Sequence, residues 1–177
     1  MTQVAEVILG EIATPLGRLG VALTTHGVGR LTFASEPFAR CESWARRWYP
    51  DASIVADAAQ LARVEDELNR YFAGDLRVFS VPVDLRGTPF QIAVWHGLQL
   101  IPYGETRSYA QMAADIGRRR SVRAVGAANG ANPVPIIVAC HRVIGSDGKL
   151  VGYGGGLDLK ERLLALEHSA APIRVAM

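Results

Sequence analysis

Helix-start signals divide this chain into two halves of different character. Thr88-Pro89-Phe90-Gln91 and Ser108-Tyr109-Ala110-Gln111 both have the form of a capping box, in which a hydroxyl and a glutamine three residues later satisfy the free backbone N–H groups of a helix start. Proline at the first helical position strengthens the former signal. Apolar residues follow each box at helical spacing. The half of the chain after residue 88 is therefore predicted to be mainly helical.

The first half has the pattern of a small sheet with two helices. Short apolar runs at 4–12, 19–24 and 28–33 are separated by turn signals, which favours an antiparallel meander. Apolar spacing predicts helices over 38–48 and 58–73, the second with a box that begins at Asp57 and a stop at Gly74. The stretch 77–84 fits either an edge strand or an extended connection.

The expected fold class is thus α/β: a small N-terminal antiparallel sheet with helices, residues 1–84, joined to a mainly helical C-terminal domain, residues 85–177. That second domain contains a helix-turn-helix, because a helix over 122–129, with Ser121 as cap and Gly130 as stop, follows the helix after Ser108. A further helix is expected after a cap at Asp158, and the tail from Ser169 is expected to be poorly ordered.

The second helix of the pair is rich in alanine and glycine. Small residues permit tight packing of helices, and they equally permit close approach to a narrow nucleic-acid groove. They leave few long polar side chains for bidentate contacts to base edges. An arginine cluster precedes and enters this helix, at Arg118, Arg119, Arg120 and Arg123. Charge and free N–H groups at a helix start suit phosphate, so DNA binding without sequence preference is predicted.

Composition sets broader limits. A net charge of +2 does not by itself indicate nucleic-acid binding, and no apolar run of membrane-spanning length or secretion signal is present, so a cytoplasmic protein is expected. The four histidines and two cysteines have no metal-ligand spacing, so no metal is assigned. Cys41 shares an apolar helix face with Phe38 and Ala45 and is predicted to lie in the core.

Cys140 ends an apolar run, is followed at once by His141, and is the candidate nucleophile. The alternative is an inert buried thiol. A thiol of pKa about 8.5 needs a nearby base, and on an extended segment His141 would point away from Cys140 unless a water bridged them. Glu167 could orient the imidazole or be a solvated helix end. The glycine-dense loop 152–156 reads either as a surface loop or as a pocket wall.

Several motifs appear together, in one order and with one set of spacings: Ile101-Pro102-Tyr103-Gly104-Glu105-Thr106, Ser108-Tyr109, Arg123-Ala124-Val125-Gly126, Asn129-Gly130, Asn132-Pro133-Val134-Pro135-Ile136, Cys140-His141-Arg142-Val143-Ile144-Gly145 and Gly152-Tyr153-Gly154-Gly155-Gly156. Together they closely resemble the O6-alkylguanine-DNA alkyltransferase family throughout residues 88–168. Residues before 85 resemble the variable α/β domain of that family more loosely.

The resemblance implies direct-reversal DNA repair. A protein of this family binds double-stranded DNA through the minor groove without sequence preference and flips the alkylated guanine out of the stack. It then transfers the O6-alkyl group irreversibly to its own cysteine, here Cys140, so that each molecule acts once and needs no cofactor. A bacterial-type, nucleoid-associated monomer is expected; activity on O4-alkylthymine and cooperativity on DNA stay open.

The resemblance also assigns residues. The catalytic set comprises Cys140, His141, Glu167, Tyr109 and Asn132. In this set His141 and Glu167 form a water-bridged relay, and Asn132 ties a backbone turn together. Tyr109 lies near the flipped base; from its helix pattern alone it would be interpreted as a core aromatic. The set that binds DNA and substrate comprises Arg123, which fills the gap in the duplex, with Ala124, Ala127, Pro135, Val143, Tyr153 and Gly154.

One residue departs from the family pattern: Ala139 stands where the family usually has proline, which frees φ and restores an N–H group. The alkyl-group preference is therefore left open. A non-catalytic lesion sensor of the alkyltransferase-like type is the alternative function, although such proteins replace the cysteine. A cysteine hydrolase is a third reading, and the helix-turn-helix argues against it.

Overall fold

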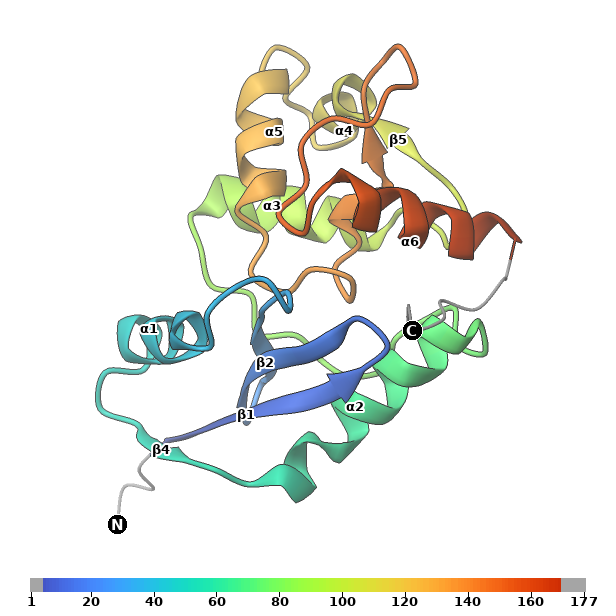
Figure 1. The fold of residues 1–177 in the computed structure, drawn as a ribbon. Helices are drawn as coiled ribbons and strands as arrows, with labels where there is room; N and C mark the ends of the chain where they lie inside the picture. The colour runs from blue at the N-terminus through green and yellow to red at the C-terminus, as the bar shows by residue number, and fades with distance from the viewer. Residues whose placement is uncertain (1–4, 170–177) are drawn as a thin grey trace. The chain divides into compact units, whose positions relative to one another are not determined.

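The computed structural model describes residues 5–169, which form two compact units, 5–86 and 87–169. The first is an α/β unit built on a sheet, and the second is mainly helical (Figure 1). The predicted fold class is confirmed. No helix within 5–169 is long and apolar enough to cross a membrane. The tail predicted to be poorly ordered lies outside the described residues, apart from Ser169, which ends the last helix.

Three antiparallel strands form the centre of the first unit, as predicted. They are β1 (Glu6–Thr14), β2 (Gly17–Thr24) and β3 (Gly27–Leu31), in a sheet of order β3-β2-β1-β4. Positive φ angles at Gly17 and Gly27 start the second and third strands, where a side chain would be strained. The short β4 (Ser53–Val55) pairs in parallel with β1 and was not predicted. The stretch 77–84 forms no strand, and Val83 makes a single bridge to Val28.

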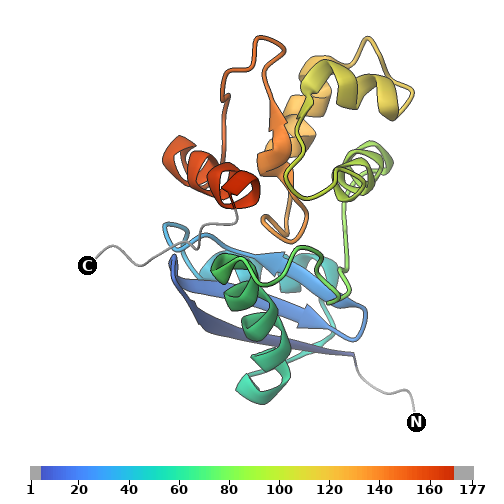
Figure 2. The same ribbon diagram turned by 90° about the vertical axis from the view of Figure 1, so that its right-hand side faces the viewer.

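The two helices of this unit cover opposite faces of the sheet (Figure 2). They are α1 (Ala39–Trp48) and α2 (Ala58–Ala73). A Cβ atom on Gly10 of β1 would collide with Leu61 of α2, whereas one on Gly20 of β2 would lie only 3.0 Å from Phe38, the N-cap of α1, and 3.1 Å from Cys41 within α1. Gly10 pairs with Val21, and successive side chains of a strand point to opposite faces. The two glycines therefore let a helix approach each face closely.

The thiol of Cys41 is fully buried among the apolar side chains between α1 and the sheet, as predicted. Burial raises its pKa to about 12, so it stays a neutral core group.

The second unit begins with the helices that the capping boxes predict. They are α3 (Pro89–Gln99), α4 (Tyr109–Asp115) and α5 (Val122–Gly130). Thr88 and Ser108 each accept a bond from a backbone N–H three residues later, and Gln91 and Gln111 close both boxes. Ser121 precedes α5 as predicted but makes no side-chain cap bond. The indole of Trp95 in α3 donates to the carbonyl of Ala128 at 2.8 Å, which ties α5 to the helix beneath it.

The remaining elements bring residues 143–144 next to the start of α4. The strands β5 (Arg107–Ser108) and β6 (Val143–Ile144) pair in parallel, a 3₁₀ turn η1 (Cys140–Arg142) precedes β6, and α6 (Leu157–Ser169) follows. The predicted cap at Asp158 is wrong. Gly156, at φ 89°, precedes α6 and its carbonyl accepts the first helical bond, from Lys160, so Asp158 lies inside the first turn.

Candidate active site

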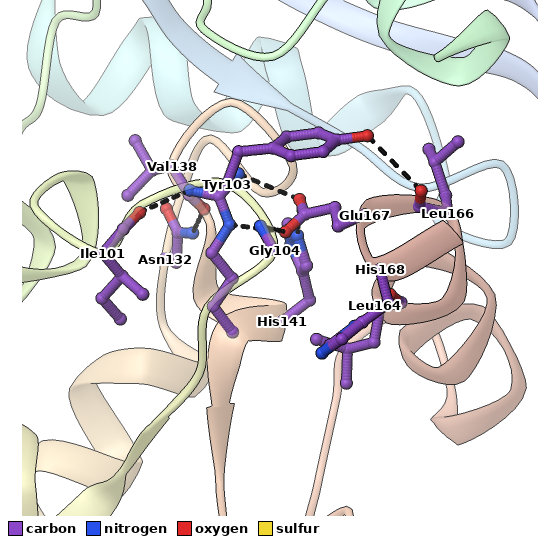
Figure 3. A network of polar contacts seen from close by, with 11 residues as sticks. Ile101, Tyr103, Gly104, Asn132, Val138, His141, Leu164, Leu166, Glu167 and His168 are labelled. Carbon is purple, nitrogen blue, oxygen red and sulfur yellow. Dashed lines mark hydrogen bonds and ion pairs between the residues drawn. The ribbon is translucent and has the colours of Figure 1, made fainter. Parts of the chain in front are cut away.

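Cys140 opens a 3₁₀ turn rather than lying on an extended segment. A turn tied by the side chain of Asn132 leads to it. The amide accepts from Val134 N at 3.0 Å, and it donates to the carbonyl of Val138 at 2.7 Å (Figure 3). Within this turn Ile136 has φ 74°, a strained value for a β-branched residue. The two bonds of Asn132 hold the strained segment in place and so fix the position of Cys140.

Ala139, where the family usually has proline, precedes Cys140 with φ −77°. The φ angle at Ala139 is therefore one that proline can also adopt.

The Cys140 thiol is 4% exposed and faces polar groups from several elements. Burial raises its pKa to about 11, although a hydrogen bond from Asn132, the positive charge of Lys160 and a hydrogen bond from Tyr153 act in the opposite direction. The thiol is therefore protonated at neutral pH, and a nucleophilic role requires a base.

Glu167 of α6 is bonded to His141, the residue after Cys140, and accepts several further hydrogen bonds (Figure 3). Its Oε1 lies 2.8 Å from His141 Nε2 and accepts from Arg142 Nη2 at 2.9 Å, and its Oε2 accepts from Arg142 Nε at 2.8 Å and from Gly104 N at 3.1 Å. Burial alone would raise the pKa of Glu167, but the bonds from His141 and Arg142 outweigh burial and hold it well below its usual range. Glu167 is therefore ionised.

An ionised carboxylate only accepts hydrogen bonds, so the proton of His141 is assigned to Nε2. Burial lowers the pKa of His141, against the raising effect of Glu167, and the ring is neutral at pH 7. Nδ1 is then left as an acceptor. A neutral imidazole oriented by a carboxylate can remove a proton from a neighbouring thiol.

Three residues that the sequence did not single out complete this site. Arg142 donates to both oxygens of Glu167 and to the carbonyl of Ile101 at 2.6 Å. Gly104, at φ 78°, approaches so closely that a Cβ atom there would lie 3.1 Å from the carbonyl oxygen of Glu167. The ammonium of Lys160, fully buried, donates to the carbonyls of Val143 at 2.6 Å and Val151 at 2.9 Å. Arg142 and Gly104 stand inside the motifs quoted above, but Lys160 has no local signal.

The other predicted residues lie in two places. Tyr109 begins α4, and its hydroxyl donates to the Val151 carbonyl at 3.3 Å. Burial raises the pKa of Tyr109, and so does the nearby Cys140. Pro135 and Val143 are buried in the segments on either side of Cys140, and Tyr153 and Gly154 belong to the glycine loop, with Gly154 exposed.

Arg123, Ala124 and Ala127 lie on the exposed side of α5. The arginines 118–120 before this helix are exposed as well. None of these side chains has a contact to Cys140 among the described interactions, so they form a separate, basic surface. Within residues 5–169 no cluster of three or more histidine, cysteine or acidic side chains could hold a metal ion.

The fold and the site define a two-unit α/β protein in which a helix-turn-helix is followed along the chain by a buried cysteine, histidine and glutamate. Residues 7–85 match the sequence profile of the ribonuclease-like domain of 6-O-methylguanine DNA methyltransferase, and residues 89–169 match that of its DNA binding domain. The chain therefore belongs to the 6-O-methylguanine DNA methyltransferase family.

Individual relatives agree with this assignment. The methylated-DNA--protein-cysteine methyltransferase of Mycobacterium tuberculosis is 48% identical over 161 residues, 91% of this chain and 92% of the relative. The inducible enzyme of Bacillus subtilis is 45% identical over 151 residues, 85% of this chain and 84% of the relative. A crystal structure of Mycobacterium tuberculosis OGT in complex with DNA has a TM-score of 0.80 at 44% identity, and the match covers 94% of this chain and 95% of that one.

Proposed function

We propose that this protein repairs DNA by direct reversal, as a methylated-DNA–protein-cysteine S-methyltransferase that moves the alkyl group from O6 of guanine to Sγ of Cys140. The observation that carries the proposal is the buried Cys140 thiol beside a neutral His141 whose orientation Glu167 sets. Membership of the family and the names of its relatives support the same reaction.

The transfer is a single displacement. His141 takes the thiol proton, through a bridging water, and the Cys140 thiolate attacks the alkyl carbon opposite the C–O bond. A C–S bond forms while the C–O bond breaks, and the bonding electrons pass to the guanine ring. Tyr109 donates a proton to the departing base, which makes it a better leaving group. The product is a thioether, which no group of the described site can cleave, so each molecule reacts once and requires no cofactor.

The helix-turn-helix is the part of the protein that binds DNA. The exposed Arg118, Arg119 and Arg120 contact phosphates, and the small Ala124 and Ala127 let α5 approach the minor groove closely. The sulfur needs an in-line approach to the alkyl carbon, which a stacked base does not permit, so the nucleotide is flipped out and Arg123 fills its place. Pro135, Val143, Tyr153 and Gly154 line the pocket for the flipped base.

The test is the mass of the protein after incubation with duplex DNA that contains one O6-methylguanine. One added methyl group, located on the peptide of Cys140 and limited to one per protein molecule, is expected. Cys140→Ser should bind the duplex and gain no mass. If the wild-type protein binds the lesion and Cys140 stays unmodified, the proposed enzymatic function is wrong and the protein is a non-catalytic lesion sensor. A parallel duplex with O4-methylthymine establishes whether that base is a second substrate.

A further inference from the structure

Asn129 is a buried asparagine with an incomplete set of hydrogen bonds. It lies in the last turn of α5 and is 4% exposed. Its Nδ2 donates to the carbonyl of Cys140 at 3.3 Å, but within residues 5–169 its Oδ1 is buried without any hydrogen-bond partner. An asparagine side chain offers two donors and one acceptor oxygen, and a buried acceptor without a donor costs free energy. A residue of the same shape without polar atoms would avoid that cost, so the amide group calls for another explanation.

The face of α5 that carries Asn129 also contacts Tyr109. A Cβ atom on Gly126, three residues before Asn129, would lie 3.8 Å from the Tyr109 ring, so this ring packs on the helix. Residues three apart share a helix face. A hydrogen bond from Asn129 lowers the pKa of Tyr109, against the raising effects of burial and of Cys140. The amide of Asn129 therefore lies between the nucleophile and the tyrosine.

We propose that Asn129 is a positioning residue for the alkyl transfer, whose side-chain amide holds the carbonyl of Cys140 and the hydroxyl of Tyr109 in register with each other. This inference rests on the proposed function, in which Cys140 attacks and Tyr109 donates a proton. The negative charge that grows on the Tyr109 oxygen as its proton leaves is stabilised by a donor that is already in place. The uncompensated Oδ1 is the consequence of turning the NH₂ group towards these two oxygens.

Asn129→Leu separates this role from a structural one. Leucine has a similar size and removes the unpaired Oδ1, while the Cys140 carbonyl keeps its bond from Val143 N, so the two effects oppose each other and the variant should unfold at about the wild-type temperature. Its single-turnover rate constant for methyl transfer, measured at saturating O6-methylguanine duplex, should fall about tenfold. The duplex concentration that gives half-maximal rate should not change, because Asn129 is buried and does not belong to the exposed face of α5 that we propose binds DNA. A stable variant that reacts at the wild-type rate would overturn the proposal, as would a rate loss that merely follows a loss of stability.

Asn129→Asp provides a second readout. A protonated aspartic acid can still donate from its hydroxyl, whereas an ionised one cannot. The variant should therefore be active at low pH and should lose activity as pH rises through the pKa of this buried carboxyl group, a step that the wild type lacks. A rate-pH profile parallel to that of the wild type would contradict the donor role. Methyl transfer by the wild-type protein in the same assay shows that the underlying reaction holds, so a failure here is distinguishable from failure of the proposed function.

Discussion

At the scale of the residue, Lys160 is the group whose environment is least expected. Its side chain is fully buried, and burial lowers its pKa, while the charge of a Cys140 thiolate raises it. Two carbonyl groups, of Val143 and Val151, hold the ammonium group in place. Since Lys160 lowers the pKa of Cys140, it stabilises the thiolate that attacks the alkyl carbon.

Lys160→Met should therefore slow methyl transfer. Methionine keeps the length and the apolar stem but removes the charge, so the pKa of Cys140 rises above about 11 and less thiolate forms at any given pH. A rise of one pKa unit corresponds to a roughly tenfold lower rate at neutral pH, recovered in part at higher pH. Transfer rates from pH 6 to 10, read by mass spectrometry of Cys140, measure the effect.

Lys149→Met is the matched control, because Lys149 is a largely exposed lysine that pairs with Asp147 in the turn after β6. It should react at the wild-type rate throughout this pH range. If Lys160→Met follows the same profile as Lys149→Met, the charge of Lys160 has no part in activating the thiol.

At the scale of the element, helix starts differ in how they are capped. The hydroxyls of Thr88 and Ser108 accept the N–H groups of Gln91 and Gln111, whereas Ser121 makes no such bond at the start of α5. A cap bond satisfies a backbone donor that a helix start otherwise leaves free. The start of α5, the helix that carries Arg123, therefore lacks the side-chain hydrogen bond that stabilises the starts of α3 and α4.

Thr88→Ala and Ser108→Ala should each lower the free energy of unfolding by about 1 kcal/mol, the usual value of a side-chain cap. Ser121→Ala serves as the control and should change it by less than about 0.5 kcal/mol. Urea unfolding followed by circular dichroism compares the three variants. A loss at Ser121 as large as at Ser108 would mean that Ser121 caps α5 in solution.

The elements also show what a sequence can predict. The starts of α3 and α4 were predictable because a capping box is a local pattern, complete within four residues. The parallel pairing of β4 with β1 was missed because three residues carry no distinct period and each lies 47 positions from its partner in β1. The 3₁₀ turn at Cys140 was missed because the amide of Asn132 and the unusual φ of Ile136 impose it, not the residues of the turn.

The candidate site divides in the same way. Cys140, His141 and Glu167 were predictable from motifs, but the four bonds that surround Glu167 join residues 25 to 63 positions away from it. Such pairings follow from the packing of α6 against η1 and not from any pattern along the chain. Lys160 belongs to this second class. Asn129 stands in one of the motifs quoted above, but only its three-dimensional surroundings show the bond to Cys140 and the unpaired oxygen.

At the scale of the whole molecule, both units depend on buried ionised groups. Asp84 accepts from Thr24 and Arg86, Glu67 from the backbone of residues 80 and 81, and Glu167 from Arg142. Burial would raise the pKa of each carboxyl group, but these hydrogen bonds outweigh it and lower the pKa. A carboxyl group with a lowered pKa stabilises the fold above the pKa that it has in the unfolded chain, and the stabilisation is lost as pH falls towards the folded value.

The free energy of unfolding should consequently fall in two stages as pH decreases. Burial gives His141 a lower pKa in the folded protein than in the unfolded chain. Below about pH 6.5 the imidazole therefore binds a proton in the unfolded chain but not yet in the folded protein. The free energy of unfolding then falls by about 1.4 kcal/mol per pH unit until the folded value is reached. Below about pH 4 the three carboxyl groups add a steeper decline. Urea unfolding at intervals from pH 8 to 3.5 measures both stages.

His141→Gln keeps a donor for Glu167 and cannot take up a proton, so it should lack the first stage and retain the second. Equal slopes for variant and wild type between pH 6.5 and 5 would mean that His141 is already charged in the folded protein, and a charged His141 could not act as the base for Cys140.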